Sequence, residues 1–90
     1  MTCRVEIPHS VQRELDALPD SVWKEAIQTI SDLREDPFPE GAHELRGHRD
    51  YFRVKFYFDR YRIIYRVSRK QRRVVITRVG IRGTAYIGYQ

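Results

Sequence analysis

The chain is poor in the features that mark secreted, membrane-bound and metal-binding proteins. It has a single cysteine in 90 residues, which excludes an intrachain disulfide and a cysteine-rich zinc site. No stretch approaches the roughly 18 consecutive apolar residues of a membrane span, and residues 1–6 lack the apolar core of a signal peptide. We therefore expect a cytoplasmic protein with no membrane partner, folded as a single domain over residues 1–90.

Conventional catalytic motifs are also missing. The sequence contains no glycine-rich phosphate-binding loop, no set of zinc ligands and no carboxylate cluster for Mg²⁺, so we expect no metal and no other cofactor. A nuclease acid–base pair made by His43 and His48 is one interpretation of the histidines, and ordinary solvated histidines are the simpler one. A domain of this size has little room for a cavity, so we expect any active site to be a surface groove.

Acidic residues are scarce in the second half of the chain. Residues 46–90 contain 13 lysines and arginines but only Asp50 and Asp59, whereas residues 1–45 contain 4 lysines and arginines against 10 acidic residues. Arginine supplies 14 of the 17 cations, and nine of the eleven aromatic residues lie in the basic half. Because arginine binds phosphate bidentately and stacks on bases, this half is predicted to bind a polyanion, most readily a nucleic acid. Solvated strand faces and an acidic protein partner are the alternatives.

Apolar spacing in the first half predicts a short strand followed by two helices. Residues 3–7 alternate as a strand does. A first helix, which Pro19 ends, has apolar side chains at Val11, Leu15 and Leu18. A second helix, capped by Asp20 or Ser21 and ended by the prolines of residues 36–39, has an apolar stripe at Val22, Trp23, Ala26, Ile27, Ile30 and Leu33. We expect Trp23 to lie in the core and the two helices to form an antiparallel hairpin.

From residue 51 onward the apolar period changes to two, which is the pattern of half-buried strands. We predict strands at residues 51–58, 61–67 and 74–79, with tight turns at Asp59-Arg60 and Lys70-Gln71. Three such strands in succession form an antiparallel meander. The predicted fold class is therefore α+β, with an N-terminal strand and an antiparallel two-helix hairpin packed on a twisted antiparallel β-sheet.

The sheet face that points away from the helices is predicted to gather cations and phenols. The residues on this face or next to it are Arg46, Arg53, Lys55, Arg62, Arg78, Arg82, Tyr86 and Tyr89. A half-exposed sheet needs polar residues on its outer face in any case. Only Asp50 and Asp59 are available nearby to neutralise the positive charges, however, and clustered cations repel one another. We therefore expect an external anion to bind there.

Several short motifs occur in an order that resembles a known family. The motifs are Glu14-Leu15-Asp16-Ala17-Leu18-Pro19, Leu33-Arg34-Glu35-Asp36-Pro37, Leu45-Arg46-Gly47, Tyr51-Phe52-Arg53-Val54-Lys55, Tyr61-Arg62-Ile63-Ile64-Tyr65, and Val79-Gly80-Ile81-Arg82 with Tyr86. Each motif is weak alone, but the ordered set spans nearly the whole chain and is similar to the RelE/ParE superfamily of type II toxins. The resemblance implies the RelE-like toxin fold.

RelE-like members of that superfamily are metal-independent endoribonucleases that act on mRNA in the ribosomal A site. They use the substrate's 2′-hydroxyl, leave a 2′,3′-cyclic phosphate and stop translation, whereas ParE-like members share the fold and poison DNA gyrase. The resemblance implies mRNA, 16S rRNA and an acidic RelB-like antitoxin as partners. It implies catalytic roles for Arg53, Lys55, Arg62, Arg82 and Tyr86, and RNA or phosphate binding by Arg46, Arg53 and Tyr89; Arg78 is predicted to bind phosphate from its position on the same sheet face.

One position departs from the family pattern, which is commonly Lys-x-Lys where this chain has Arg53-Val54-Lys55. Because arginine stays protonated at working pH, we predict that Arg53 clamps a phosphate and that Lys55 moves the proton. Tyr86 would stack on a base or shuttle a proton, and Tyr89 is the alternative for that role. The favoured function is a ribosome-dependent mRNA endonuclease; a gyrase inhibitor and a non-catalytic RNA-binding module of the same fold are the alternatives.

Overall fold

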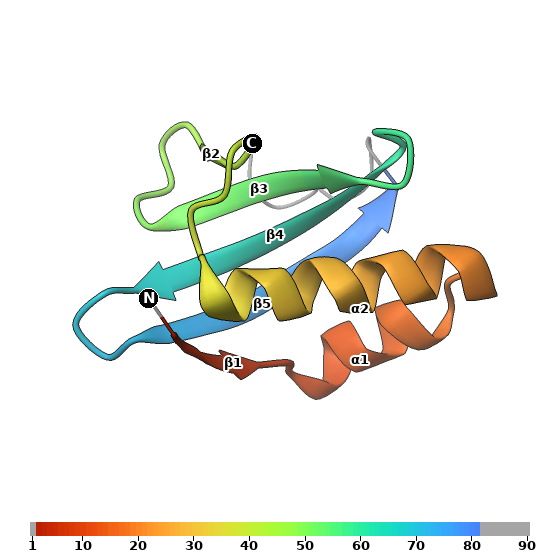
Figure 1. The fold of residues 1–90 in the computed structure, drawn as a ribbon, viewed down its shortest axis with the longest axis horizontal. Coiled ribbons are helices and arrows are strands. Elements are labelled where there is room, and N and C mark those ends of the chain that lie inside the picture. The colour runs from red at the N-terminus through yellow and green to blue at the C-terminus, as the bar shows by residue number, and fades with distance from the viewer. Residues whose placement is uncertain (1, 82–90) are drawn as a thin grey trace.

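Figure 1 shows the computed structural model of the chain, which describes residues 2–81 and leaves residues 1 and 82–90 outside the description. The helices are α1 (His9–Asp16) and α2 (Asp20–Glu35). The strands are β1 (Arg4–Glu6), β2 (His43–Glu44), β3 (Tyr51–Phe56), β4 (Tyr61–Ser68) and β5 (Arg73–Ile81). The helical hairpin therefore separates the first strand from the other four.

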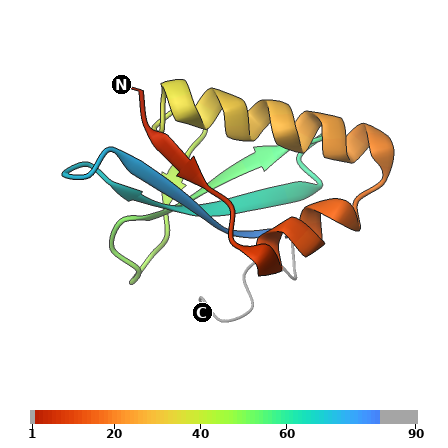
Figure 2. The ribbon, with the colours of Figure 1, turned by 90° about the horizontal axis from the view of Figure 1, so that it is seen from below.

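The strands form one sheet in the order β1-β5-β4-β3-β2, and both helices pack on one of its faces (Figure 1 and Figure 2). The predicted α+β fold is confirmed, and β2 through β5 pair antiparallel. The prediction of a wholly antiparallel sheet is wrong in one respect, because β1 pairs parallel with the start of β5, where Val5 lies opposite Val74. Alternation along a strand shows which face is buried and carries no information about the neighbouring strand.

Two prolines set the starts of the helices. Pro8 and Pro19 occupy the N-cap positions of α1 and α2 with φ of −60° and −56°, the value that the proline ring imposes. Neither N-cap makes a side-chain hydrogen bond, so the predicted capping by Asp20 or Ser21 is wrong. Asp20 instead lies in the first turn of α2, where its negative charge interacts favourably with the helix dipole.

Apolar side chains from one sheet face and from the facing stripes of the helices form the core. The buried strand residues of this core are Val54, Phe56, Ile63, Tyr65, Val67, Val74, Ile76 and Val79. On α2 the buried positions repeat every three or four residues, at Val22, Ala26, Ile30 and Leu33. Trp23 is 39% exposed, so its predicted place in the core is wrong. Adjacent helical side chains point about 100° apart, and burying Val22 therefore turns Trp23 outward.

Tyr65, in the middle of the sheet, makes a hydrogen bond to the segment that follows α2. Its side chain is fully buried, and its hydroxyl donates a 2.8 Å hydrogen bond to the carbonyl oxygen of Pro37. Burial raises the pKa of the Tyr65 phenol well above its ordinary value of 10.0, because the phenolate would lose its hydration. The hydroxyl therefore stays protonated and keeps donating over the whole neutral range.

We expect the Tyr65→Phe variant to lose about 1 kcal/mol of unfolding free energy, because the Pro37 carbonyl loses its donor. The raised pKa of the Tyr65 phenol also makes the stability of the fold depend on pH. The stabilisation is fully present below the phenol's unfolded pKa of 10.0 and is lost as pH rises above it, since the unfolded chain gives up that proton more readily. Urea unfolding at neutral and alkaline pH measures both effects, with Tyr61→Phe, a half-buried position on the same strand, as the control. A Tyr65→Phe variant as stable as Tyr61→Phe would contradict this account.

Candidate active site

Strand register brings two of the predicted catalytic residues into one row at one end of the sheet. Lys55 on β3 lies opposite Arg62 on β4, and Arg62 lies opposite Gly80 on β5. Their neighbours along the strands, which include Val54, Ile63 and Val79, belong to the core under the helices. Because successive side chains alternate between faces, the Lys55–Arg62–Gly80 row belongs to the face that points away from the helices. Gly80 contributes no side chain to that row.

Arg62 is buried, with only 2% of its surface exposed, so the prediction of an exposed cation is wrong for this residue. One terminal nitrogen, Nη1, donates to the carbonyl oxygens of Asp59 at 2.5 Å and of Tyr61 at 3.0 Å. Its Nε–H is buried and has no hydrogen-bond partner among the described residues. A buried donor without a partner costs free energy, so Arg62 is a guanidinium fixed through Nη1 whose Nε–H has a hydrogen bond still to make.

The turn that Arg62 braces has an uncommon backbone. Tyr57, Phe58 and Asp59 have φ of 52°, 56° and 61°, which is the left-handed region that residues other than glycine and asparagine seldom adopt. The strand therefore ends at Phe56 rather than at residue 58 as predicted, and Phe58 is 84% exposed. Hydrogen bonds across the turn hold it, since Arg60 N donates to the Tyr57 carbonyl at 3.1 Å and Arg62 binds the Asp59 carbonyl.

The next row on the same face contains Arg53, which lies between His43 of β2 and Ile64 of β4. Arg53 is half-buried and Lys55 is exposed. Leu45 packs on Ile64 in a small second cluster, and this contact folds the loop after β2 onto the open face of the sheet. Arg46 follows Leu45 in that loop and is exposed. The open face therefore gathers Arg53, Lys55 and Arg62, together with the loop that carries Arg46.

Arg78 differs from these cations because a carboxylate neutralises it. Its Nε donates to Oε2 of Glu14 at 3.1 Å, and the backbone N–H of Val79 donates to Oε1 of the same residue at 3.0 Å. The prediction that only Asp50 and Asp59 are available to neutralise the cations is therefore wrong. Glu14 lies on α1, 64 residues away in sequence from Arg78, so the spacing of charges gave no signal for this pair.

Glu14 joins α1 to β5 beyond the point where β1 ends, and its removal is expected to destabilise the fold. Glu14→Ala removes the carboxylate that accepts from Arg78 Nε and from the Val79 N–H, at an expected cost of about 2 kcal/mol of unfolding free energy. Glu14→Gln keeps one carbonyl oxygen for Val79 and should lose less. In urea unfolding, we expect the unfolding free energy to fall in the order wild type, Glu14→Gln, Glu14→Ala. The exposed Glu25→Ala variant is the control. If Glu14→Ala loses no more unfolding free energy than Glu25→Ala, Glu14 does not stabilise the contact between α1 and β5.

The remaining predicted site residues lie outside the described part of the chain. They are Arg82, Tyr86 and Tyr89. β5 ends at Ile81, so Arg82 directly follows the strand that contributes Gly80 to the Lys55–Arg62 row. The choice between Tyr86 and Tyr89 therefore stays a prediction. Within residues 2–81, no group of three or more His, Cys, Asp or Glu side chains is arranged to hold a metal ion, and no helix there is long and apolar enough to cross a membrane.

Comparison with known families decides what kind of protein carries this site. The sequence model of the ParE toxin of the type II toxin–antitoxin system parDE matches residues 5–86. The chain belongs to the RelE/ParE superfamily of type II toxins. The match covers almost the whole chain and confirms the resemblance drawn from the sequence motifs. A search of curated protein sequences found no match.

Solved structures of RelE toxins share the fold of this RelE/ParE toxin. The archaeal RelE–RelB complex from Pyrococcus horikoshii OT3 is 29% identical, with 94% of this chain and 100% of that chain covered and a TM-score of 0.78. The toxin–antitoxin complex RelBE2 from Mycobacterium tuberculosis is 25% identical, with coverages of 91% and 100% and a TM-score of 0.77. A mutant of Escherichia coli RelE in the free state is 21% identical, with coverages of 99% and 93% and a TM-score of 0.82, and it supports the fold alone.

The sequence comparison and the structure comparison name different branches of the superfamily. The family model is that of ParE, whereas these solved structures are of RelE proteins, two of them in complexes with antitoxins. Membership of the superfamily therefore establishes a type II toxin and leaves its target to be argued from the site.

Proposed function

We propose that this RelE/ParE toxin is a cytoplasmic, ribosome-dependent endoribonuclease that cleaves mRNA in the ribosomal A site without a metal ion. One observation carries the proposal: Lys55 lies opposite Arg62 on the neighbouring strand, and the Arg62 guanidinium is held by two carbonyls and has an Nε–H without a hydrogen-bond partner among the described residues. A non-bridging phosphate oxygen is a strong acceptor for such a donor. The donor set is also fixed before substrate arrives, which is what efficient stabilisation of a charged transition state requires.

The proposed reaction needs only groups that RNA and this chain supply. The 2′-oxygen of the ribose attacks the adjacent phosphorus while losing its proton, the bond from phosphorus to the 5′-oxygen breaks, and that oxygen gains a proton. The products are a 2′,3′-cyclic phosphate and a free 5′-hydroxyl. DNA lacks the attacking hydroxyl, so RNA selectivity follows from the chemistry.

Each residue on the open face has a proposed part in this reaction. Arg62 stabilises the extra negative charge on the phosphorane, and Lys55 moves the proton. Arg53 and Arg46 hold flanking phosphates, while Arg82 and a tyrosine at position 86 or 89 would complete the site. Arg78 is neutralised by Glu14 and is a weaker candidate for phosphate binding than the sequence indicated. Acid–base groups are few, so the ribosome is expected to align the substrate for in-line attack.

An acidic RelB-like antitoxin is the proposed inhibitory partner, since two similar toxins were solved with antitoxins and the open face is basic. A segment of aspartates and glutamates over Lys55 and Arg62 would occupy the positions of the RNA phosphates. Cleavage is therefore expected to stop when the cognate antitoxin is added at equal concentration.

The ParE name of the matching family model favours a second candidate, inhibition of DNA gyrase. A third candidate from the sequence, an RNA-binding module without activity, has the same basic face. The three are separated by a cell-free translation reaction on a defined mRNA, in which RNA ends are mapped and DNA supercoiling is followed in parallel. Cuts within translated codons that end in 2′,3′-cyclic phosphates support the nuclease. Gyrase-dependent DNA breaks with intact mRNA would favour the second candidate, and RNA binding without cuts would favour the third.

A further inference from the structure

The guanidinium of Arg62 is held by main-chain oxygens at the start of β4 and in the turn before it. Its Nη1 donates to the carbonyls of Asp59 at 2.5 Å and of Tyr61 at 3.0 Å. Among residues 2–81, no carboxylate forms an ion pair with it. The position of this guanidinium therefore depends on the conformation of the turn.

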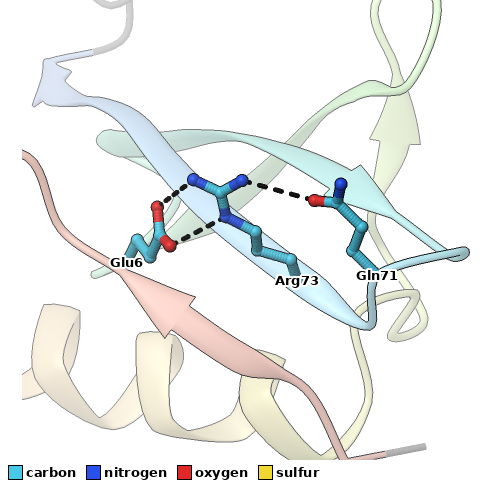
Figure 3. A network of polar contacts seen from close by, with 3 residues as sticks. All are labelled: Glu6, Gln71 and Arg73. Carbon is cyan, nitrogen blue, oxygen red and sulfur yellow. Dashed lines mark hydrogen bonds and ion pairs between the residues drawn. The ribbon is translucent and has the colours of Figure 1, made fainter.

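Arg73, at the other end of the sheet, is held differently, as Figure 3 shows. Its guanidinium makes two hydrogen bonds to the carboxylate of Glu6 on β1, one of them from Nε at 2.8 Å, and a third bond to the side-chain oxygen of Gln71 at 3.3 Å. The carboxylate on the neighbouring strand fixes Arg73 whatever the conformation of the turn before β5. Arg62 has no such carboxylate among the described side chains, so a shift of its turn moves its guanidinium.

The turn before Arg62 has a conformation that its residues do not favour by themselves. Tyr57, Phe58 and Asp59 are consecutive residues with positive φ, and none of them is glycine. Residues other than glycine stay in this region only where the contacts around them impose it. Inside the turn, Arg60 N donates to the Tyr57 carbonyl at 3.1 Å. Contacts from outside the turn must supply the rest of the constraint.

Tyr57 supplies such a contact. Its hydroxyl lies 3.2 Å from the hydroxyl of Ser21, in the first turn of α2, and its ring packs against the core. The start of α2 and the turn between β3 and β4 lie at the same end of the molecule (Figure 1). Because Ser21 and Tyr57 are 36 residues apart in sequence, this hydrogen bond joins the strained turn to a separate helix.

We propose that Tyr57 and Ser21 are positioning residues for Arg62. Their hydrogen bond holds the left-handed turn in the conformation whose carbonyls fix the guanidinium. Neither residue acts on the substrate itself, and the action of Arg62 on a phosphate rests on the proposed function. Because a donor stabilises a transition state best when it is fixed before the substrate arrives, a looser turn lowers the rate of the chemical step and leaves ribosome binding unchanged.

The test is single-turnover cutting of a defined mRNA on programmed ribosomes by the full chain. Tyr57→Phe keeps the ring and removes the hydroxyl, and Ser21→Ala removes its partner. Each is expected to lower the rate about fivefold, the effect of one hydrogen bond, with ribosome affinity unchanged. The double variant should lose no more than either single variant, because all three lack the same bond.

Two matched controls separate this effect from a general loss of stability. Tyr65→Phe also loses one tyrosine hydroxyl bond, to the Pro37 carbonyl, and Ser31→Ala also removes an exposed serine hydroxyl from α2. Both controls should cut at the wild-type rate at a temperature where urea unfolding shows every variant to be folded.

A double-mutant cycle with Arg62→Ala shows whether Tyr57 acts through Arg62. In the Arg62→Ala background, Tyr57→Phe should change the residual rate by less than about twofold, because the group that it positions is already gone. The inference is wrong if Tyr57→Phe lowers the rate equally in both backgrounds, or if Tyr57→Phe and Ser21→Ala cut as fast as their controls. It is also wrong if Tyr57→Phe weakens ribosome binding and leaves the rate unchanged.

A readout without cleavage separates this inference from the proposed function. The Nε–H of Arg62 is followed by NMR in the nitrogen-15-labelled full chain. Tyr57→Phe and Ser21→Ala are each expected to speed its exchange with water about fivefold, and Ser31→Ala should leave it unchanged. A wild type that leaves mRNA intact but shows this pattern would refute the proposed nuclease and leave the positioning in place. Exchange that neither variant speeds would overturn the positioning.

Discussion

Replacing Arg62 with alanine is expected to lower mRNA cleavage by a factor on the order of 10²–10³, the usual effect of losing a preorganised donor to a developing oxyanion. Arg62 is 2% exposed, its guanidinium is held by two turn carbonyls, and its Nε–H is unpaired in the described part of the chain, so it offers a fixed donor to the phosphate. Arg62→Lys should lose most of the activity as well, because an ammonium cannot bind the two turn carbonyls and a phosphate with the same geometry. The measurement is the rate of cutting of a defined mRNA on programmed ribosomes.

The control for this variant separates chemistry from folding. Arg62 also braces the left-handed turn at residues 57–60, and its removal is expected to cost about 2 kcal/mol of unfolding free energy. Rates are therefore compared at a temperature where urea unfolding shows the variant to be folded. Arg66→Ala, an exposed arginine four residues along the same strand face, should cut within a fewfold of the wild type. A folded Arg62→Ala protein that matches Arg66→Ala in rate would remove Arg62 from the mechanism.

Changing Lys55 to arginine is expected to lower cleavage by a factor on the order of 10²–10⁴, the range that proton transfer by a positioned side chain contributes. Arginine keeps the positive charge opposite Arg62 but does not give up its proton at working pH. Ribosome binding should therefore stay within about threefold of the wild type while the rate falls. Single-turnover cutting and ribosome affinity, measured on the same preparation, distinguish the two quantities.

Arg53→Lys is the matched change in the same strand, and it restores the Lys-x-Lys pattern of the family. Arg53 is assigned to phosphate binding, so a lysine there keeps the charge and is expected to cut within a fewfold of the wild type. If Arg53→Lys is as impaired as Lys55→Arg, the division of roles between the two residues is wrong. Full activity of Lys55→Arg would show that the proton moves through another group, with Tyr86 the first candidate.

The elements that apolar periodicity specifies were predictable from the sequence. Alternation in β3 and β4 identifies which side chains point to the core, and this parity alone is enough to place Lys55 and Arg62 on the opposite face. Pro19 and the prolines that follow residue 36 indicated where the two helices end, because proline cannot continue a helix from the preceding residue. Burial of the apolar face of a helix or strand contributes a large free energy. The periodicity of apolar residues therefore indicates these elements even when the long-range contacts are unknown.

Features that depend on long-range contacts could not be predicted in the same way. The left-handed turn at residues 57–60 continues an alternating pattern that favours a strand through Phe58, and contacts such as the bond from Arg62 to Asp59 override it. The Glu14–Arg78 pair joins segments 64 residues apart, and the parallel pairing of β1 with β5 joins the two ends of the described chain. The placement of Lys55 and Arg62 on one face followed from strand parity, whereas the burial of Arg62 depends on three-dimensional packing.

The most direct test of the proposed attack by the 2′-hydroxyl is an mRNA with a single deoxyribose at the cleavage site. A programmed ribosome carries an mRNA in which only the nucleotide before the mapped cut is 2′-deoxy, and cutting by the purified wild-type toxin is compared with the all-ribose message. We expect cleavage at that bond to disappear while the toxin still binds the ribosome, because Arg62 and Lys55 act on an attack that the substrate's own hydroxyl must make. Cutting at an undiminished rate would show that the nucleophile comes from elsewhere, and the role assigned to the Lys55–Arg62 row would be wrong.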